Sequence, residues 1–122
     1  MNASALAPLS NIVWHSLDGS QSHLSAGSGR IRRFAPGFSQ LIGAREREAP
    51  AFDDLVPYCA PDERFYVLGW LGAPPPGWRV DVDAEVDQLV WERPAPDAMD
   101  AHDLVRLGPS HVARMIALTE LT

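Results

Sequence analysis

Acidic side chains recur in one stretch with the spacing of a calcium-binding loop. They belong to Asp81, Asp83, Glu85, Asp87 and Glu92. An EF-hand loop places its ligands in this way, but its sixth position must be a glycine that makes a sharp turn. That position is Val86, and the valines between the acidic residues favour extended structure. We therefore interpret the stretch as a strand with one acidic face exposed to solvent.

A second stretch, LSAGSG at residues 24–29, resembles a phosphate-binding glycine loop. In such a loop, successive backbone N–H groups bind an anion. A dinucleotide-binding loop also needs a strand before it and a third glycine three residues further on. A polar stretch precedes this one, and Arg32 occupies the third position. We interpret the segment as a connection rather than a phosphate site.

The remaining reactive side chains lack the arrangement that a catalytic or metal site requires. The histidines show no metal-ligand spacing among themselves; they are His15, His23, His102 and His111. Cys59 has no Cys or His near it in the sequence, so we predict a buried structural thiol rather than a nucleophile. No serine lies in a G-x-S-x-G motif. These residues support no metal site and no catalysis by the chain alone.

Two further groups of residues have structural interpretations. RIRRF, residues 30–34, is a small basic cluster with one aromatic residue. We interpret it as a solvated edge strand rather than an RNA contact, because arginine stems can cover a sheet face. The tryptophans are spread over different segments, which favours a place in the core over the lining of a ligand groove. They are Trp14, Trp70, Trp78 and Trp91.

Composition narrows the class of protein. The chain has 122 residues, of which 46% are hydrophobic and 21% are charged, as in one globular domain. Its net charge of −6 disfavours a nucleic-acid binder. The single cysteine cannot form an intramolecular disulfide, no apolar run approaches the roughly 20 residues of a membrane span, and the N-terminus has no secretory pattern. We expect a cytoplasmic protein with no nucleic-acid or membrane partner.

The first half of the chain predicts two helices, one strand and a short apolar run. SNIVWHSLDG, residues 10–19, reads as a short helix that Ser10 or Asn11 caps. A polar connection with one helical turn over residues 20–29 follows, then the RIRRF strand and the apolar run FSQLIGA, residues 38–44. APAFDDLVPYCAP, residues 49–61, has apolar residues at helical spacing, although Pro57 weakens the helix.

The second half predicts strands and a linker. RFYVLGWLG, residues 64–72, has the aromatic and apolar run of a buried central strand. Residues 78–92 alternate as two strands or one long bent strand. We therefore expect an α/β (α+β) fold, with a small, mainly antiparallel mixed sheet and flanking helices over residues 1–92. The proline-rich and alanine-rich segment 93–102 reads as a linker, and a second unit begins at residue 103.

The last twenty residues predict a strand, a turn and an amphipathic helix. Residues 102–107 alternate as a strand, Gly108 turns the chain, and either Ser110 caps the helix or Pro109 occupies its first turn. One apolar stripe runs along the helix. It comprises Val112, Met115, Ile116 and Thr119, widened by Leu118 and Leu121. No capping residue follows the stripe, so we expect a sheet in further sequence to cover it; the alternative is that the helix packs back on the first unit.

Several segments, in this order, resemble one family. The strand, turn and helix are similar to the opening of the GNAT superfamily of N-acetyltransferases, which has the pattern R-x-L-x-x-x-D-v-x-x-m-x-x-L. The spacing is matched by Leu107, Val112, Met115 and Leu118, and Arg106 lies one position after the place of the arginine. A histidine stands where the family commonly has Asp. Three earlier segments resemble bacterial members in which a degenerate GNAT-like half precedes the catalytic half. They are NIVWHSL at residues 11–17, with isoleucine in place of a proline, GRIRRF at residues 29–34 and DQLVWE at residues 87–92.

The resemblance implies acetyl transfer from acetyl-CoA to an amine by the parent protein. It also implies that this chain alone is inactive, because the Q/R-x-x-G-x-G/A loop that binds the acetyl-CoA pyrophosphate and the general base belong to the catalytic half. LSAGSG has that glycine spacing, but Leu24 stands at the Gln/Arg position and the segment precedes the first catalytic strand. By the same resemblance, Thr119, Glu120 and Thr122 approach the acceptor side. The implied partner is the catalytic half, or a second copy through self-association.

A non-enzymatic alternative stays open at this point. The chain would then be a binding or interaction module, complete at 122 residues, whose last helix docks on its own sheet or on that of a partner. Acetyl-CoA would have no effect on such a module, and the isolated chain would unfold cooperatively as a monomer.

Overall fold

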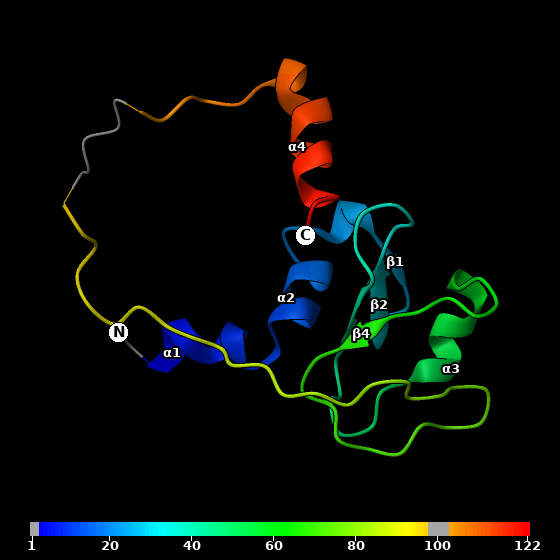
Figure 1. Cartoon of the computed structure of the whole chain (residues 1–122). Helices are drawn as coiled ribbons and strands as arrows, with labels where there is room; N and C mark the ends of the chain where they lie inside the picture. Colours follow the sequence, from blue (N-terminus) through cyan, green and yellow to red (C-terminus); the bar gives the residue numbers. More distant parts are fainter. Residues whose placement is uncertain (1–2, 98–102) are drawn as a thin grey trace. The chain divides into compact units, whose positions relative to one another are not determined.

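The computed structural model describes residues 3–97 and 103–122. The chain divides into two compact units, Met1–Gln88 and Leu89–Thr122, which are described separately below. The predicted linker over residues 93–102 falls in the second unit, and its residues 98–102 lie outside the described part. Figure 1 shows the elements of both units in chain order.

A four-stranded mixed sheet forms the centre of the first unit. Its strands are β1 (Ser25–Gly27), β2 (Ile31–Phe34), β3 (Leu41–Ala44) and β4 (Tyr66–Val67), in the order β1-β2-β3-β4. The first three pair antiparallel, and β4 pairs parallel to β3 with Leu41 opposite Tyr66. This confirms the predicted fold class, an α+β fold with a small, mainly antiparallel mixed sheet.

The sequence predicted that RIRRF would be an edge strand, and this prediction is wrong. RIRRF forms β2, which lies between β1 and β3. SAG, the β1 segment, has no apolar alternation, so its sequence does not indicate a strand. Its backbone nevertheless supplies the antiparallel partner, with Ser25 opposite Phe34 and Gly27 opposite Arg32. The predicted helical turn before it is confirmed as η2 (Ser22–Leu24).

Helix α2 (Ile12–Asp18) covers one face of the sheet. It follows α1 (Ala3–Leu6) and η1 (Ala7–Asn11), and it buries Val13, Trp14 and Leu17. Asn11 occupies the N-cap position, as predicted, but neither its side chain nor that of Ser10 bonds to the helix start. The Asn11 amide instead donates to the carbonyl oxygen of Ala44, 2.8 Å away, which ties the helix to β3.

Helix α3 (Phe52–Leu55) covers the opposite face (Figure 1). Residues paired across antiparallel strands share a face, so the pairs Ile31–Ala44 and Arg33–Ile42 point the same way. Ile31, Ile42 and Ala44 form the core with Phe52 and Leu55. The helix tightens into η3 (Val56–Tyr58) at Pro57, which lacks an N–H for the α-helical bond.

Aromatic rings close the core on the α3 side. The Phe52 and Trp70 rings meet edge to face with centroids 5.0 Å apart, and Phe52 and Trp78 lie 5.1 Å apart. Together with the buried Trp14, this confirms the core role predicted for three tryptophans. Trp91 is different: it is exposed, and its indole N–H donates to the carbonyl oxygen of Pro94.

The strands predicted over residues 64–72 and 78–92 are largely wrong. RFYVLGWLG was expected to be a central strand, but only Tyr66 and Val67 pair, and they lie at the sheet edge. Gly69 has a φ of +73°, which ends the extended run, and Leu71 is 96% exposed. Residues 78–92 form no strand, because their alternating pattern finds no paired backbone among the described residues.

The described residues of the second unit contain one α-helix. Residues 109–111 form η4 (Pro109–His111), and α4 (Val112–Thr119) follows directly, which confirms the predicted amphipathic helix. Pro109 lies in the first turn as expected, whereas Gly108 rather than Ser110 precedes the helix, and its N–H donates to Nδ1 of His111. Residues 103–107 form no strand, so that prediction is wrong for the part described. None of the helices described is long and apolar enough to span a membrane.

Candidate functional site

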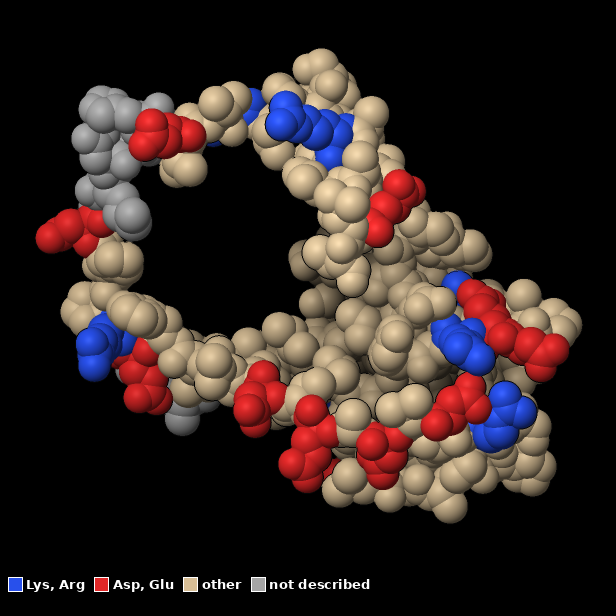
Figure 2. All heavy atoms as spheres, viewed as in Figure 1, with Lys and Arg blue, Asp and Glu red and all other residues tan. Residues whose placement is uncertain are grey.

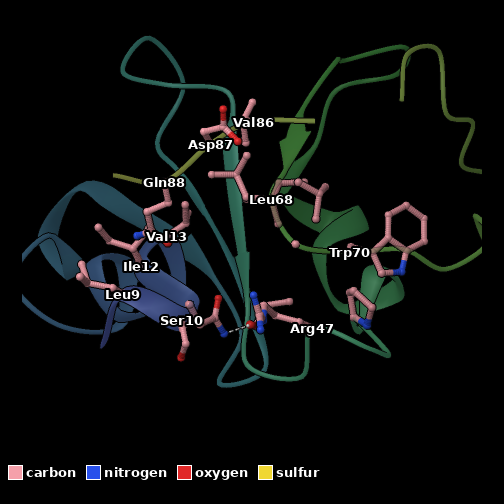
Figure 3. A pocket seen from close by; sticks show the side chains of 16 residues that line it. Leu9, Ser10, Ile12, Val13, Arg47, Leu68, Trp70, Val86, Asp87 and Gln88 are labelled. Carbon is pink, nitrogen blue, oxygen red and sulfur yellow. Dashed lines mark hydrogen bonds between the residues drawn. The ribbon is translucent and has the colours of Figure 1, made fainter. Parts of the chain in front are cut away.

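The first unit contains a cavity where strands β3 and β4 separate. Their pairing ends at Ile42 and Val67, while β3 continues to Ala44. The cavity has a volume of about 340 Å³ and is lined by residues 9–13 at the start of α2, by β3, by residues 67–70 and by residues 86–88. Figure 3 shows these side chains around the opening. Ligand sites typically have volumes of about 300–1,000 Å³.

The cavity walls are mostly apolar, with a few polar groups. Ile12 and Val13 from α2 and Leu68 and Trp70 from the segment after β4 supply apolar surface. The Asn11 amide is already engaged with Ala44, as the dashed line in Figure 3 marks. Among the lining residues, Arg47 is the one with a cationic side chain.

Arg47 differs from the other shielded arginines. Arg32, Arg33 and Arg47 are the arginines of the described chain that are not exposed. Arg32 donates to Ser25 and Ser28, and Arg33 is paired with Glu63. No hydrogen bond or ion pair joins the Arg47 guanidinium to another residue of the described chain.

Gly69 makes room for this arginine. A Cβ atom at Gly69 would come within 2.6 Å of Nη1 of Arg47, so the guanidinium lies against bare backbone. Neither residue belonged to a motif in the sequence. An isolated glycine within an apparent strand nevertheless indicates that another group approaches the backbone closely. Gly69 is such a glycine, and it is the sequence feature that could have indicated this site.

A second group of polar residues, around Arg33 and Glu63, forms its hydrogen bonds within the protein. Arg33 is 2% exposed, and its Nη2 lies 2.6 Å from Oε1 of Glu63. The same guanidinium donates to the carbonyl oxygens of Phe34 and Tyr58, and its Cζ lies 4.7 Å from the Phe65 ring centroid. Hydrogen bonds from Arg33 and from the Ala60 N–H lower the pKa of Glu63. This cluster therefore holds β2 to the loop after η3, and four of the five guanidinium N–H donors are used inside it.

Cys59 lies beside that cluster and is half-buried. Burial raises the pKa of the thiol, and Sγ donates to the Leu55 carbonyl oxygen at 3.3 Å. A raised pKa leaves less of the nucleophilic thiolate. The thiol packs against the core, which confirms its predicted structural role, although it is less deeply buried than expected.

The glycine-containing stretch at residues 24–29 forms β1 and the turn into β2. The Ser28 N–H donates to the Ile31 carbonyl oxygen, and the Ser28 hydroxyl donates to Asp54. Arg30 also binds Asp54, at 2.9 Å, and these hydrogen bonds lower the pKa of that carboxyl. The Ser28 N–H is thus used inside the hairpin, and the Ser28 hydroxyl and the Arg30 guanidinium are used against α3.

The acidic stretch is exposed, and red side chains follow it in Figure 2. Asp81 pairs with Arg79 at 2.7 Å and lies 3.7 Å from Arg64. Within residues 3–97 and 103–122, no three His, Cys, Asp or Glu side chains gather closely enough to hold a metal ion. His102 lies outside the described residues.

The residues nominated for the acceptor side lie at the end of α4 in the second unit. Thr119 ends the helix, Glu120 and Thr122 follow it, and all three are exposed. The Thr119 hydroxyl donates to the carbonyl oxygen of Ile116, and the Thr122 hydroxyl donates to that of Thr119. Their hydroxyls therefore bond within the helix end, and their relation to a substrate stays a prediction.

No protein-family model, curated protein or solved structure matches this chain.

Proposed function

We propose that this chain is the N-terminal part of an acetyl-CoA-dependent N-acetyltransferase. The first unit is its non-catalytic lobe, and α4 is the first helix of its catalytic domain. The observation that carries this assignment is the exposed apolar stripe of α4, on the same segment that resembles the opening of the GNAT superfamily.

The stripe needs a surface to cover it. Met115 is 37% exposed and Ile116 is 54% exposed, and no described side chain of residues 89–122 is buried. Helix α4 has 8 residues, and isolated helices below about 12–15 residues are marginal in water. Its stability therefore depends on packing. The sheet of a catalytic domain, which the resemblance implies, would supply that packing.

The proposed reaction is acetyl transfer from acetyl-CoA to an amine. The amine nitrogen attacks the thioester carbonyl carbon, and oriented donors stabilise the negative charge on the oxygen of the tetrahedral intermediate. The C–S bond then breaks, coenzyme A leaves as the thiolate, and the nitrogen loses a proton to a base. This chain has neither the pyrophosphate-binding loop nor the base, so it binds no acetyl-CoA by itself. Thr119, Glu120 and Thr122 lie on the acceptor side.

The same stripe favours one other candidate, a non-enzymatic interaction module. In that case the surface that covers α4 belongs to a separate protein, and acetyl-CoA plays no part. The two candidates differ in the size and chemistry of the native gene product.

The test begins with the native product in its own cells. Mass spectrometry of the intact protein should give a mass well above the 13.3 kDa of the 122 residues. That product should release coenzyme A from acetyl-CoA when primary amines are added. The 122-residue chain serves as the control and should release none. A native product that ends at Thr122 and has no acetyl-CoA-binding partner would contradict the proposal and favour the interaction module.

A further inference from the structure

We propose that the cavity in the first unit binds a small organic monocarboxylate with an apolar body. Arg47 holds the carboxylate, and the apolar walls at Ile12, Val13, Leu68 and Trp70 cover the body. This goes beyond the proposed acetyl transfer, which assigns no ligand to the first unit.

The lack of a bonded partner for Arg47 is the first reason to propose an anionic ligand. A shielded cation without a partner is unfavourable, because it has lost part of its hydration and gained no counter-charge. Arg47 is half-buried and unpaired within the described chain, whereas Arg32 and Arg33, the other shielded arginines, are both bonded. A planar guanidinium binds a carboxylate through two parallel hydrogen bonds, so an anion in the cavity would supply the missing partner.

The charge on the other side of the cavity selects the kind of anion. Asp87 also lines the cavity, and Figure 3 shows it away from Arg47, across the opening. One cation and one carboxylate in the lining disfavour a doubly charged ligand such as a phosphate monoester. A single carboxylate is neutralised by Arg47 alone, and the exposed Asp87 stays hydrated.

The apolar walls and the volume define the rest of the ligand. About 340 Å³ is at the small end of ligand cavities, so a body of one ring and a short chain fits. Gly69 leaves space for the guanidinium, because a Cβ atom there would lie 2.6 Å from Nη1 and the end of the Arg47 side chain would have to shift.

The test uses the full chain, with 3-phenylpropanoate as the probe and 3-phenylpropanol as its neutral counterpart. Backbone amide shifts in NMR spectra measure both affinities. The acid should bind about tenfold more tightly than the alcohol, since one charge-assisted pair contributes at least this factor. Shifts should centre on residues 11–13 and 67–70.

Arg47→Ala should remove the preference for the acid and leave the binding of the alcohol unchanged. Arg45→Ala is the matched control, because Arg45 is exposed, lies two positions away and does not line the cavity. Ile12→Trp, at a residue that is 44% exposed, should fill the opening and weaken both probes without disturbing the core. Equal binding of acid and alcohol to the native chain, equal effects of the two arginine variants, or shifts confined to α4 would each overturn the proposal.

Discussion

Arg33 shows how a charged side chain can occupy the interior of so small a sheet. Burial of an arginine is unfavourable unless its donors are bonded. Here the guanidinium meets Glu63 through two nitrogens, donates to two carbonyl oxygens and stacks on the Phe65 ring. The residue therefore acts as a tie between β2 and the loop after η3, rather than as a group for chemistry.

Glu63→Gln tests this tie through the pH dependence of stability. The bond from Arg33, followed by that from Ala60, lowers the pKa of Glu63 in the folded state. A lowered folded-state pKa contributes stability that is present above the unfolded value of about 4.3 and is lost as the pH falls through the folded value. The variant should be less stable at pH 7, by about 1–3 kcal/mol for a bond to a charged group, and should lose less stability in acid.

Urea denaturation at pH 7 and near pH 3 measures both effects. Glu48→Gln is the control, because it makes the same chemical change at an exposed residue. If both variants show the same difference in free energy of unfolding between the two pH values, the ion pair contributes nothing to folding.

At the scale of elements, Gly43 decides how closely α2 can approach β3. A Cβ atom at Gly43 would lie 2.6 Å from the backbone nitrogen of Trp14 and 2.7 Å from its Cα atom. These are atoms of a helix backbone, which cannot rotate away as the end of a side chain can. The absence of a side chain therefore lets Val13 and Leu17 reach the sheet.

Gly43→Ala should separate α2 from the sheet and destabilise the first unit. Overpacking in a close-packed interior costs about 1–3 kcal/mol, so the melting temperature should fall by several degrees. Gly29→Ala is the matched control, because nothing lies within 4 Å of a Cβ atom there and its φ is not in the left-handed region. Calorimetry on both variants gives the comparison. An unchanged melting temperature for Gly43→Ala would mean that α2 does not pack on β3 in this way.

The elements that could be predicted from sequence are those whose signals are local. The residue spacing in NIVWHSL and FDDLVPY predicts α2 and α3, and Pro57 marks the change to η3. Strand position depends on partners far away in sequence, so β2 was misplaced at an edge and β1 was missed. Residues 64–72 have the composition of a buried strand, but the backbone at Gly69 turns away after two paired residues.

The cavity could not be predicted for a similar reason. Arg47 lies in a polar loop with acidic neighbours, and its surroundings come from α2, from residues after β4 and from residues 86–88. Only the folded chain brings these segments together. Cys59 could be assigned a structural role because the absence of neighbouring ligands is itself visible in the sequence.

At the scale of the whole molecule, the two units differ in how they are stabilised. Every buried side chain of the described residues belongs to the first unit, between Val13 and Leu55. The second unit has a helix with one apolar face and no core among its described residues. Exposed apolar stripes of this kind mark surfaces that another chain or segment covers.

Ile116→Gln should weaken self-association of the 122-residue chain. If the stripe is left uncovered, we expect it to pack against the stripe of a second copy. Each isoleucine buried there would contribute about 1.5–3 kcal/mol, or tenfold and more in dissociation constant. Ala117→Gln places the same side chain on the face away from the stripe, one residue and about 100° further round the helix, and should change nothing. Sedimentation velocity over a concentration series measures the effect.

The melting temperature of the first unit is the second measurement on Ile116→Gln and Ala117→Gln. If α4 packs on a surface that this chain does not supply, Ile116→Gln leaves the melting temperature unchanged, because no α4 side chain belongs to the buried core. If α4 instead packs back on the first unit, as the alternative from the sequence holds, Ile116→Gln lowers the melting temperature and Ala117→Gln does not. A lowered melting temperature with unchanged self-association would therefore reject the exposed stripe as a docking face, and with it the observation on which the acetyltransferase assignment depends.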